Sequence, residues 1–220
     1  MSGLLEPRGD FKSLLAYQKA ELLYDLTFYF AHTHLSRGDR TVDQMVQAAR
    51  SGKQNIAEAS AAAATSAETE IKLTNVAKAS LIELRIDYED YLRVRTLRQW
   101  EKDSQEALYL REKSRDKALT LAWCLAIART RPAETTANIC ICLLHQADYL
   151  LQRQLESLET KFLSQGGFKE KMFAARLQAR NANPPARPLS SRPSPPTSSS
   201  NPSSPSIPRH PSSPRKAPPQ

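Results

Sequence analysis

The chain of 220 residues carries 31 Lys/Arg and 23 Asp/Glu, which gives a formal net charge of +8, and it has three cysteines. An odd number of cysteines in apolar runs, with no secretory signal at Met1–Lys12, argues against a disulfide-stapled secreted protein. No apolar run reaches the ~18–20 residues of a membrane-spanning helix. We therefore expect a cytoplasmic protein of one ordinary domain plus an extension, without a membrane partner.

The basic residues are concentrated toward the C-terminal end. Residues 1–160 carry 21 basic and 22 acidic side chains, whereas residues 161–182 carry five and one. Residues 183–220 hold 13 of the 15 prolines, 11 serines, five Lys/Arg and no acidic residue. Such a segment cannot bury enough apolar surface to offset the entropy of ordering it. We expect a disordered, basic Pro/Ser-rich tail there, and a flexible N-terminus over residues 1–10.

Helix-breaking residues are absent from most of the body. Neither Gly nor Pro occurs between Lys53 and Arg131, or between Ala133 and Gln165, and good helix formers fill both stretches. No strand pattern is present. The sequence therefore predicts an all-α fold, with a helical body over residues 11–165 and a short basic helical suffix over 166–182. Long helices with short turns favour an up-down antiparallel four-helix bundle with an additional helical segment.

The first predicted helix spans Phe11–His34, with Asp10 as its N-cap and Leu15, Leu22, Leu26 and Tyr29 on its apolar side. The second begins at Thr41, whose capping box is completed by Gln44. Its small or apolar residues follow a seven-residue repeat: Val42, Met45, Ala49, Gly52, Ile56, Ala59 and Ala63. Small side chains let a neighbouring helix approach closely.

Three further helices follow. One begins after Thr65, in a capping box with Glu68, and runs to about Arg95. Asp103 caps the next, which extends toward Ala128, and its first half is charged while its second half is apolar. The last has Pro132 in its first turn and stops at the glycine pair 166–167, before the basic suffix.

Residues that suggest chemistry have simpler interpretations. A di-iron bundle needs Glu-x-x-His pairs, which are absent, so the acidic run at Glu83, Asp87, Glu89 and Asp90 is predicted to be a solvated face paired with Arg85 and Arg93. Cys140, Cys142 and His145 are close in sequence, but on a helix at most Cys142 and His145 share a face. Two such ligands do not make a zinc site, which needs four. We therefore predict that the cysteines pack in the core. No nucleophile has a base beside it, and no phosphate-binding loop occurs. We predict no catalytic residue, metal or cofactor.

One segment of the second helix is open to two interpretations. Arg50, Gln54 and Glu58 form a row at i, i+4 spacing, with Lys53 one position off it. Long polar side chains beside a seam of small residues form a recognition surface or, more simply, a solvated face. The residues alone favour the solvated face.

This segment resembles a known signature. The stretch Gln44–Glu58 is similar to the second helix of a bacterial four-helix-bundle family, which includes proteins encoded in intervening sequences of large-subunit ribosomal RNA genes and accessory proteins of diversity-generating retroelements. The matching positions are Ala48-Ala49 and Asn55-Ile56-Ala57-Glu58. Four other segments resemble a subgroup with a C-terminal suffix: Thr65–Leu73, Asp87–Arg93, His145–Leu151 and Phe162–Phe168. The resemblance covers about residues 11–180.

The resemblance implies a homo-oligomeric ring, often a pentamer. In the retroelement branch it also implies binding of nucleic acid and of a reverse transcriptase. The chain departs from the pattern at three places, with Val46-Gln47 in place of an Arg pair, Gly52-Lys53 in place of Ile-Pro, and Ala59 in place of Gly. If the Arg pair contacts nucleic acid in relatives, Arg50 and Lys53 have to replace it here.

Together these features favour a non-enzymatic, self-assembling accessory or scaffold protein that binds nucleic acid electrostatically. RNA is favoured over DNA as the ligand. The candidate contacts are Arg50, Lys53, Lys169, Lys171, Arg176 and Arg180. The alternative is a protein–protein interaction module without nucleic-acid binding. It would use the bundle surface and the Pro-x-x-Pro spacings of the tail, such as Pro193 to Pro196.

Overall fold

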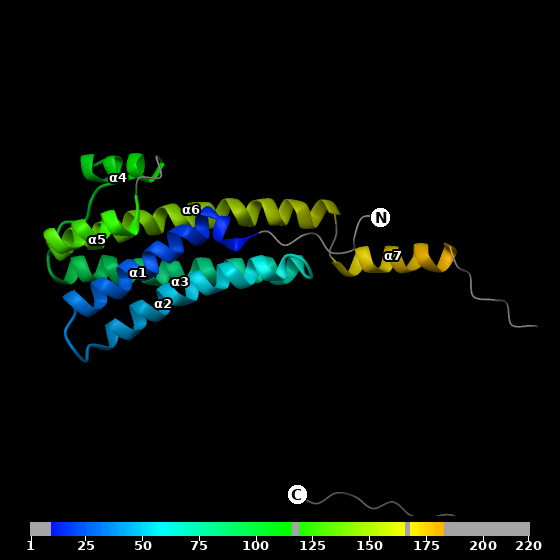
Figure 1. Ribbon diagram of the computed structural model, residues 1–220, viewed down its shortest axis with the longest axis horizontal. Coiled ribbons are helices and arrows are strands. Elements are labelled where there is room, and N and C mark those ends of the chain that lie inside the picture. Colours follow the sequence, from blue (N-terminus) through cyan, green and yellow to red (C-terminus); the bar gives the residue numbers. More distant parts are fainter. Residues whose placement is uncertain (1–9, 116–118, 166–167, 183–220) are drawn as a thin grey trace, which may run out of the picture. The chain divides into compact units, whose positions relative to one another are not determined.

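The computed structural model of the protein consists of helices and their connections (Figure 1). It describes residues 10–115, 119–165 and 168–182. Within these ranges no strand occurs, which confirms the all-α prediction. The elements in chain order are η1 (Phe11–Ser13), α1 (Leu15–His34), α2 (Arg40–Ala62), α3 (Ala67–Val94), α4 (Gln105–Arg115), α5 (Leu121–Thr130), α6 (Ala133–Gln165) and α7 (Phe168–Ala182).

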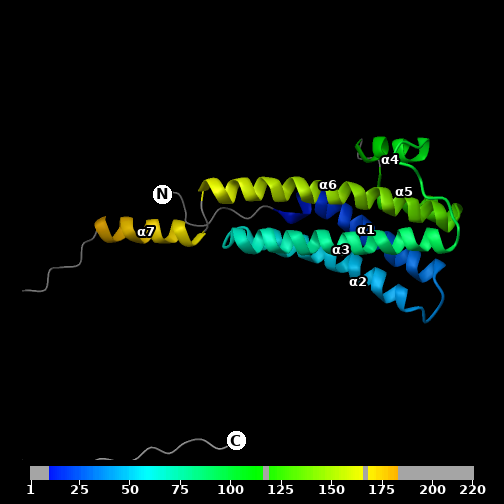
Figure 2. The same ribbon diagram turned by 180° about the vertical axis from the view of Figure 1, so that it is seen from behind.

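Four of these helices enclose the core. Helix α1 packs on α2, α2 on α3, α3 on α6, and α6 back on α1, so the contacts form a closed cycle. The chain reverses direction from each of these helices to the next (Figures 1 and 2). The largest fully buried side chains are Tyr88, Phe30, Leu23, Leu26, Met45, Ile56, Leu81, Leu84, Leu92, Leu110, Leu143 and Leu144.

The first predicted helix is divided in the structure into the short 3₁₀ helix η1 and the helix α1. Asp10 caps the 3₁₀ turn η1, where its carboxylate accepts a hydrogen bond from the Lys12 N–H at 3.1 Å. Helix α1 begins only at Leu15, which is 54% exposed, and Leu22 and Tyr29 are only half-buried. Of the predicted apolar side, Leu26 alone is buried. Because α1 is apolar on several sides, its neighbours and not its periodicity decide which face is buried.

Two predicted N-caps were wrong by one or two positions. Asp39, not Thr41, caps α2 and accepts the Thr41 N–H at 2.9 Å. This bond lowers the pKa of the Asp39 carboxyl. Ser66, not Thr65, caps α3 and accepts the Thr69 N–H at 3.1 Å. Asp and Ser are better N-caps than Thr, and here each lies beside the predicted residue.

The small-residue seam of α2 is confirmed over its central part. Met45, Ala49, Gly52, Ile56 and Ala59 are buried, and α2 makes its most extensive contacts with α3. A Cβ atom added at Gly52 would lie 2.5 Å from Leu81 Cδ2. The ends of the repeat were wrong: Val42 is half-buried, and Ala63 is exposed and follows the last residue of α2.

The helix predicted over residues 103–128 is two helices, α4 and α5. The hydroxyl of Ser104 accepts the Ala107 N–H at 3.3 Å at the start of α4, in place of the predicted cap Asp103. Thr120 caps α5 by accepting the Trp123 N–H at 3.2 Å. The charged and the apolar half have different neighbours: α4 contacts α6, whereas α5 contacts both α1 and α6.

Asn138 on α6 anchors the connection between α3 and α4. Its side chain is buried, and its amide donates to the carbonyls of Arg98 and Glu134, each at 2.9 Å. Its amide oxygen accepts the Trp100 N–H at 2.7 Å. Both N–H groups of this amide therefore donate, and its oxygen accepts one hydrogen bond, as a buried polar side chain requires.

The C-terminal part begins and ends close to where the sequence predicts. Pro132 directly precedes α6, and its carbonyl accepts the Thr135 N–H at 2.9 Å. Helix α6 ends at Gln165. The glycine pair, residues 1–9 of the predicted flexible N-terminus and the predicted disordered tail 183–220 lie outside the described residues. Among the described helices, none combines the length and apolarity needed to cross a membrane.

Candidate nucleic-acid interface

Two of the six predicted contacts lie on α2, Arg50 away from its buried seam and Lys53 at the edge of that seam. Arg50 is exposed, and Lys53, three positions later, is half-buried. Gln54 and Glu58 are also exposed, as a solvated face requires. Residues three apart are neighbours on a helix, so α2 brings Arg50 and Lys53 together.

Lys53 faces α1. Its Nζ atom lies 4.3 Å from the centroid of the Tyr24 ring, a cation–π distance. The charge of Lys53 also affects Asp25. Burial raises the pKa of the Asp25 carboxyl, and the nearby lysine charge partly offsets this increase. Lys53 therefore has partners within the bundle. Arg50 has no ion-pair partner among the described residues.

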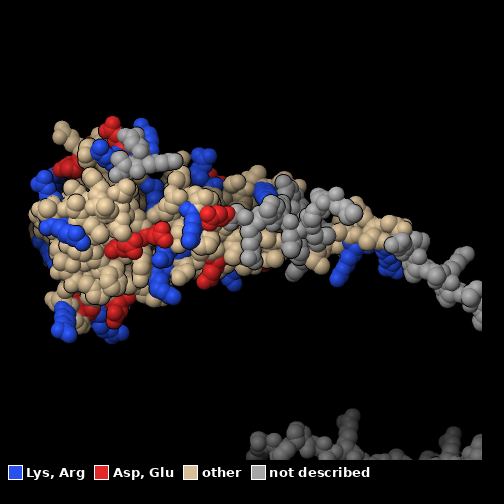
Figure 3. All heavy atoms as spheres, in the orientation of Figure 1, with Lys and Arg blue, Asp and Glu red and all other residues tan. Residues whose placement is uncertain are grey.

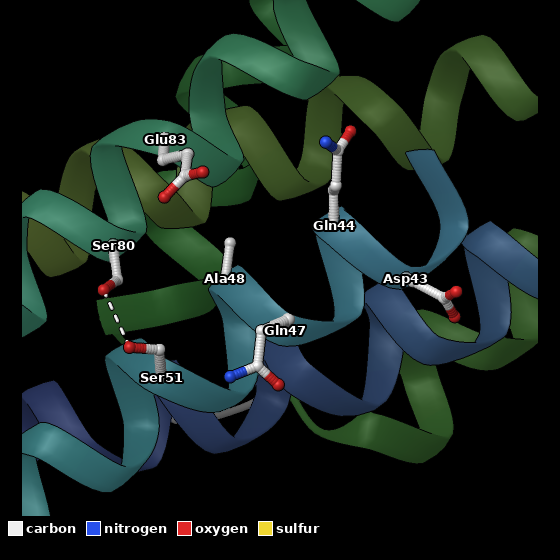
Figure 4. A pocket seen from close by; sticks show the side chains of 7 residues that line it. All are labelled: Asp43, Gln44, Gln47, Ala48, Ser51, Ser80 and Glu83. Atoms are coloured by element: carbon white, nitrogen blue, oxygen red, sulfur yellow. Dashed lines mark hydrogen bonds between the residues drawn. The ribbon is translucent and has the colours of Figure 1, made fainter. Parts of the chain in front are cut away.

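A groove between α2 and α3 lies close by (Figure 4). Its volume is about 390 Å³. Its lining residues are Asp43, Gln44, Gln47, Ala48, Ser51, Ser80 and Glu83. The hydroxyls of Ser51 and Ser80 hydrogen bond across the helices at 2.9 Å. Carboxylates and no cations line this groove, so it repels phosphate and suits a cationic group instead.

The groove was not predicted from the sequence. Its only signal is the small residues, Ala48 and Ser51 on α2 and Ser80 on α3, which leave space where the helices meet. That signal becomes readable only once the pairing of the two helices is known. Gln47 is part of its lining as well.

The other four predicted contacts lie on α7. Arg176 and Arg180 are exposed and lie one turn apart. Lys169 occupies the same strip of the helix, about two turns before Arg176, because a helix turns 100° per residue. Lys171 falls on nearly the opposite side and does not join the strip. Of Lys169 and Lys171 the structure describes the backbone only.

Charge is distributed differently on the bundle and on α7. On the face shown in Figure 3, basic and acidic side chains alternate over the bundle, whereas the charged side chains visible on α7 are basic. The described carboxylates form no ion pair with Arg176 or Arg180. The strip on α7 is therefore the candidate site with the most concentrated positive charge.

The acidic run on α3 is a surface feature with pairing of the kind predicted. Arg85 lies 3.5 Å from Glu89, and Arg93 lies 2.7 Å from Asp90. Burial, with Glu83 and Asp90 nearby, raises the pKa of Asp87 to about 6. Groups of three or more His, Cys, Asp or Glu side chains able to hold a metal ion are absent from the part of the chain that the structure describes.

The three cysteines lie in surroundings that disfavour the thiolate. Cys140 is fully buried, and burial raises its pKa to about 12. Burial likewise raises the pKa values of Cys124 and Cys142 to about 11. His145 is exposed and takes a hydrogen bond from Arg85 at 3.2 Å. Burial therefore favours the protonated thiol at all three cysteines.

Comparison with models of protein families, with curated proteins and with solved structures finds no match to the chain.

Proposed function

We propose that the chain is a non-enzymatic accessory or scaffold protein that binds nucleic acid through contacts to phosphate. RNA is the favoured ligand and DNA the second. The observation that carries the proposal is the strip on α7, where Arg176 and Arg180 are exposed and unpaired by the described carboxylates. Residues 161–182 carry a net charge of +4, against −1 for residues 1–160. Basic side chains that neutralise phosphates release counterions, and this term needs no base sequence.

The proposal includes the architecture and self-assembly. We take the closed cycle of α1, α2, α3 and α6 as an up-down antiparallel four-helix bundle with a disordered tail. Apolar side chains exposed on α3 and α6 support a homo-oligomer: Ile86 is 48%, Tyr149 60% and Leu163 84% exposed. A ring, a pentamer by the resemblance of α2, would multiply the copies of α7 and raise avidity. Light scattering coupled to size exclusion tests this, and a clean monomer at micromolar concentration contradicts it.

The binding test is a titration of the full chain with labelled RNA at several salt concentrations. Three double variants are compared with the wild type: Arg176→Ala/Arg180→Ala, Arg50→Ala/Lys53→Ala, and Arg129→Ala/Arg131→Ala as a control that removes equal charge from the end of α5. Each lost phosphate contact reduces the slope of log affinity against log salt by about 0.7–0.9. We expect the largest reduction in the α7 variant and the smallest in the control.

One observation favours the second candidate, a protein-interaction module. The groove between α2 and α3 carries the carboxylates of Asp43 and Glu83, which suit a basic side chain of a protein partner. By the resemblance of α2, that partner would be a reverse transcriptase. If no variant and no wild-type protein shows salt-sensitive RNA binding, this candidate replaces the first. Asp43→Asn/Glu83→Gln should then weaken the protein complex.

A further inference from the structure

Helix α7 exposes large apolar side chains beside its basic strip. Phe173 is 67% exposed and Leu177 is 50% exposed. Met172 and Ala175, on another side of α7, are half-buried. Glu170, Ala174 and Gln178 are exposed as well, so the side that carries Phe173 is one of several sides of α7 open to solvent. Covering an aromatic ring that is exposed to water is favourable, so a ligand that packs on Phe173 gains binding free energy.

The apolar and basic residues of this side are interleaved. At 100° per residue, positions 169, 173, 176, 177 and 180 fall within an arc of about 100°. Phe173 follows Lys169 by four positions and precedes Arg176 by three, so both are its neighbours on the helix surface. Leu177 and Arg180 are neighbours in the same way. Glu170, three positions before Phe173, is exposed at the edge of this arc. A ligand on the arc therefore meets three basic positions, one carboxylate and an aromatic face within about three turns.

We infer that α7 binds single-stranded nucleic acid, with Arg176 and Arg180 on phosphates and Phe173 stacked on an unpaired base. This inference rests on the proposed function and narrows its ligand. A single strand offers phosphates and bare base faces in alternation, which is the pattern on the arc. In a duplex the base faces are stacked on one another, so Phe173 would find no partner there.

A membrane surface fits this arc less well. A helix that lies in a membrane interface separates its apolar residues on one face from its Lys and Arg residues on the other. On α7 the exposed Phe173 lies between basic positions, and the other apolar side, with Met172 and Ala175, is half-buried. Charge and apolar surface are therefore mixed on one side, as bases and phosphates are mixed along a strand.

The experiment measures fluorescence anisotropy of labelled oligo-U and of an RNA hairpin of equal length, with the full chain. The variants are Phe173→Leu, Phe173→Trp, Arg176→Ala/Arg180→Ala and the control Phe162→Leu, which changes an aromatic side chain on α6 that is 37% exposed. Far-UV circular dichroism checks that each variant keeps its helix content. Phe173→Leu keeps the apolar character and removes the ring, and Phe173→Trp enlarges the ring.

We expect Phe173→Leu to weaken oligo-U binding about fivefold or more with an unchanged salt slope, because base stacking is lost and no charge changes. Phe173→Trp should keep or raise the affinity, and Phe162→Leu should leave it unchanged. Arg176→Ala/Arg180→Ala should lower the salt slope by about 1.4 for the single strand. The hairpin should bind more weakly than oligo-U.

The outcomes separate the two proposals. If oligo-U binding depends on Arg176 and Arg180 but not on Phe173, or if the hairpin binds as well as oligo-U, the stacking inference is overturned and the proposed function stands. If neither RNA binds in a salt-sensitive way, both fail. Phe173-dependent binding to phosphatidylserine vesicles without RNA binding would overturn the inference in favour of a membrane surface.

Discussion

The ammonium of Lys53 on α2 lies 4.3 Å from the centre of the Tyr24 ring on α1, so one of the two candidate contacts on α2 already has a partner within the protein. A cation–π contact at such a surface contributes about 0.5–1 kcal/mol to stability. A phosphate that binds Lys53 has to compete with this contact. Arg50 is exposed and unpaired by the described carboxylates, so it is the more available of the two.

The single variants of this pair should therefore separate stability from binding. Lys53→Ala is expected to lower the free energy of unfolding by about 0.5 kcal/mol, whereas Arg50→Ala should leave it nearly unchanged. In an RNA titration, Arg50→Ala should reduce the salt slope more than Lys53→Ala does. Urea denaturation and the titration give both quantities. An equal or larger slope change in Lys53→Ala would show that Tyr24 does not hold the ammonium.

A second prediction concerns Asn138, whose buried amide links the connection after α3 to α6. Asn138→Ala leaves the Trp100 N–H and the Arg98 carbonyl without this partner, so it should cost about 1–3 kcal/mol of stability. Asn138→Asp keeps the acceptor for Trp100 but loses the donor to Arg98, and it buries a carboxylate. It should therefore also destabilise, increasingly as the pH rises above the ordinary range of an Asp pKa. Urea unfolding at pH 5 and pH 8 measures both effects.

A third prediction concerns the close approach of α2 to α3 at Gly52. A Cβ atom at position 52 would lie 2.5 Å from Leu81 Cδ2 and 2.8 Å from Leu81 Cγ, and Leu81 is buried. Gly52→Ala gains about 1 kcal/mol of helix propensity but overpacks the seam, a cost of typically about 1–3 kcal/mol. We expect a net loss of about 1 kcal/mol in the free energy of unfolding.

The double-mutant cycle with Leu81→Ala identifies the cause. Leu81→Ala alone should cost about 2–5 kcal/mol because it leaves a cavity. In the Gly52→Ala background it removes the clash as well, so it should cost less by about 1 kcal/mol or more. Additive effects of the two substitutions would mean that α2 and α3 shift apart without strain, which would contradict close packing at Gly52.

The sequence predicted the helical class and most helix positions because these depend on local features. The stretch without Gly or Pro over residues 53–131 holds the end of α2 and all of α3, α4 and α5, and the stretch over residues 133–165 is α6. The central repeat of α2 became its buried seam. Errors arose where two local signals compete. Asp39 lies two positions before Thr41, and Ser66 directly follows Thr65, and capping preference alone does not fix the first turn.

The parts of the candidate site that the sequence did not predict depend on pairs of distant residues. The contact of Lys53 with Tyr24 and the groove between Ser51 and Ser80 each join two helices, so neither leaves a pattern in either helix alone. The strip on α7 was readable from residue spacing. The exposure of Phe173 within that strip was not, because an apolar residue on an amphipathic helix is ordinarily expected to be covered.

The last prediction concerns Asp87 on α3, where like charges oppose ionisation. Its pKa is raised to about 6 by partial burial, then by Glu83 four positions before it and Asp90 three positions after it. A carboxyl whose pKa is higher in the folded chain than its ordinary value of 3.8 favours folding when protonated. Its ionisation therefore lowers stability as the pH rises from about 3.8 to about 6, and the cost is complete above that range.

Asp87→Asn removes this cost, so the variant should be more stable than the wild type by about 0.5 kcal/mol at pH 7.5, a value reduced for solvent screening, and no more stable at pH 3.5. Glu83→Gln removes the main opposing charge and should show the same trend more weakly. Asp90→Asn is the matched contrast, because it also loses the pairing with Arg93 at 2.7 Å and so gains less. Urea unfolding at pH 3.5, 5.5 and 7.5 follows the difference. A stabilisation by Asp87→Asn that is equal at all three values would mean that ionisation of Asp87 is not its cause.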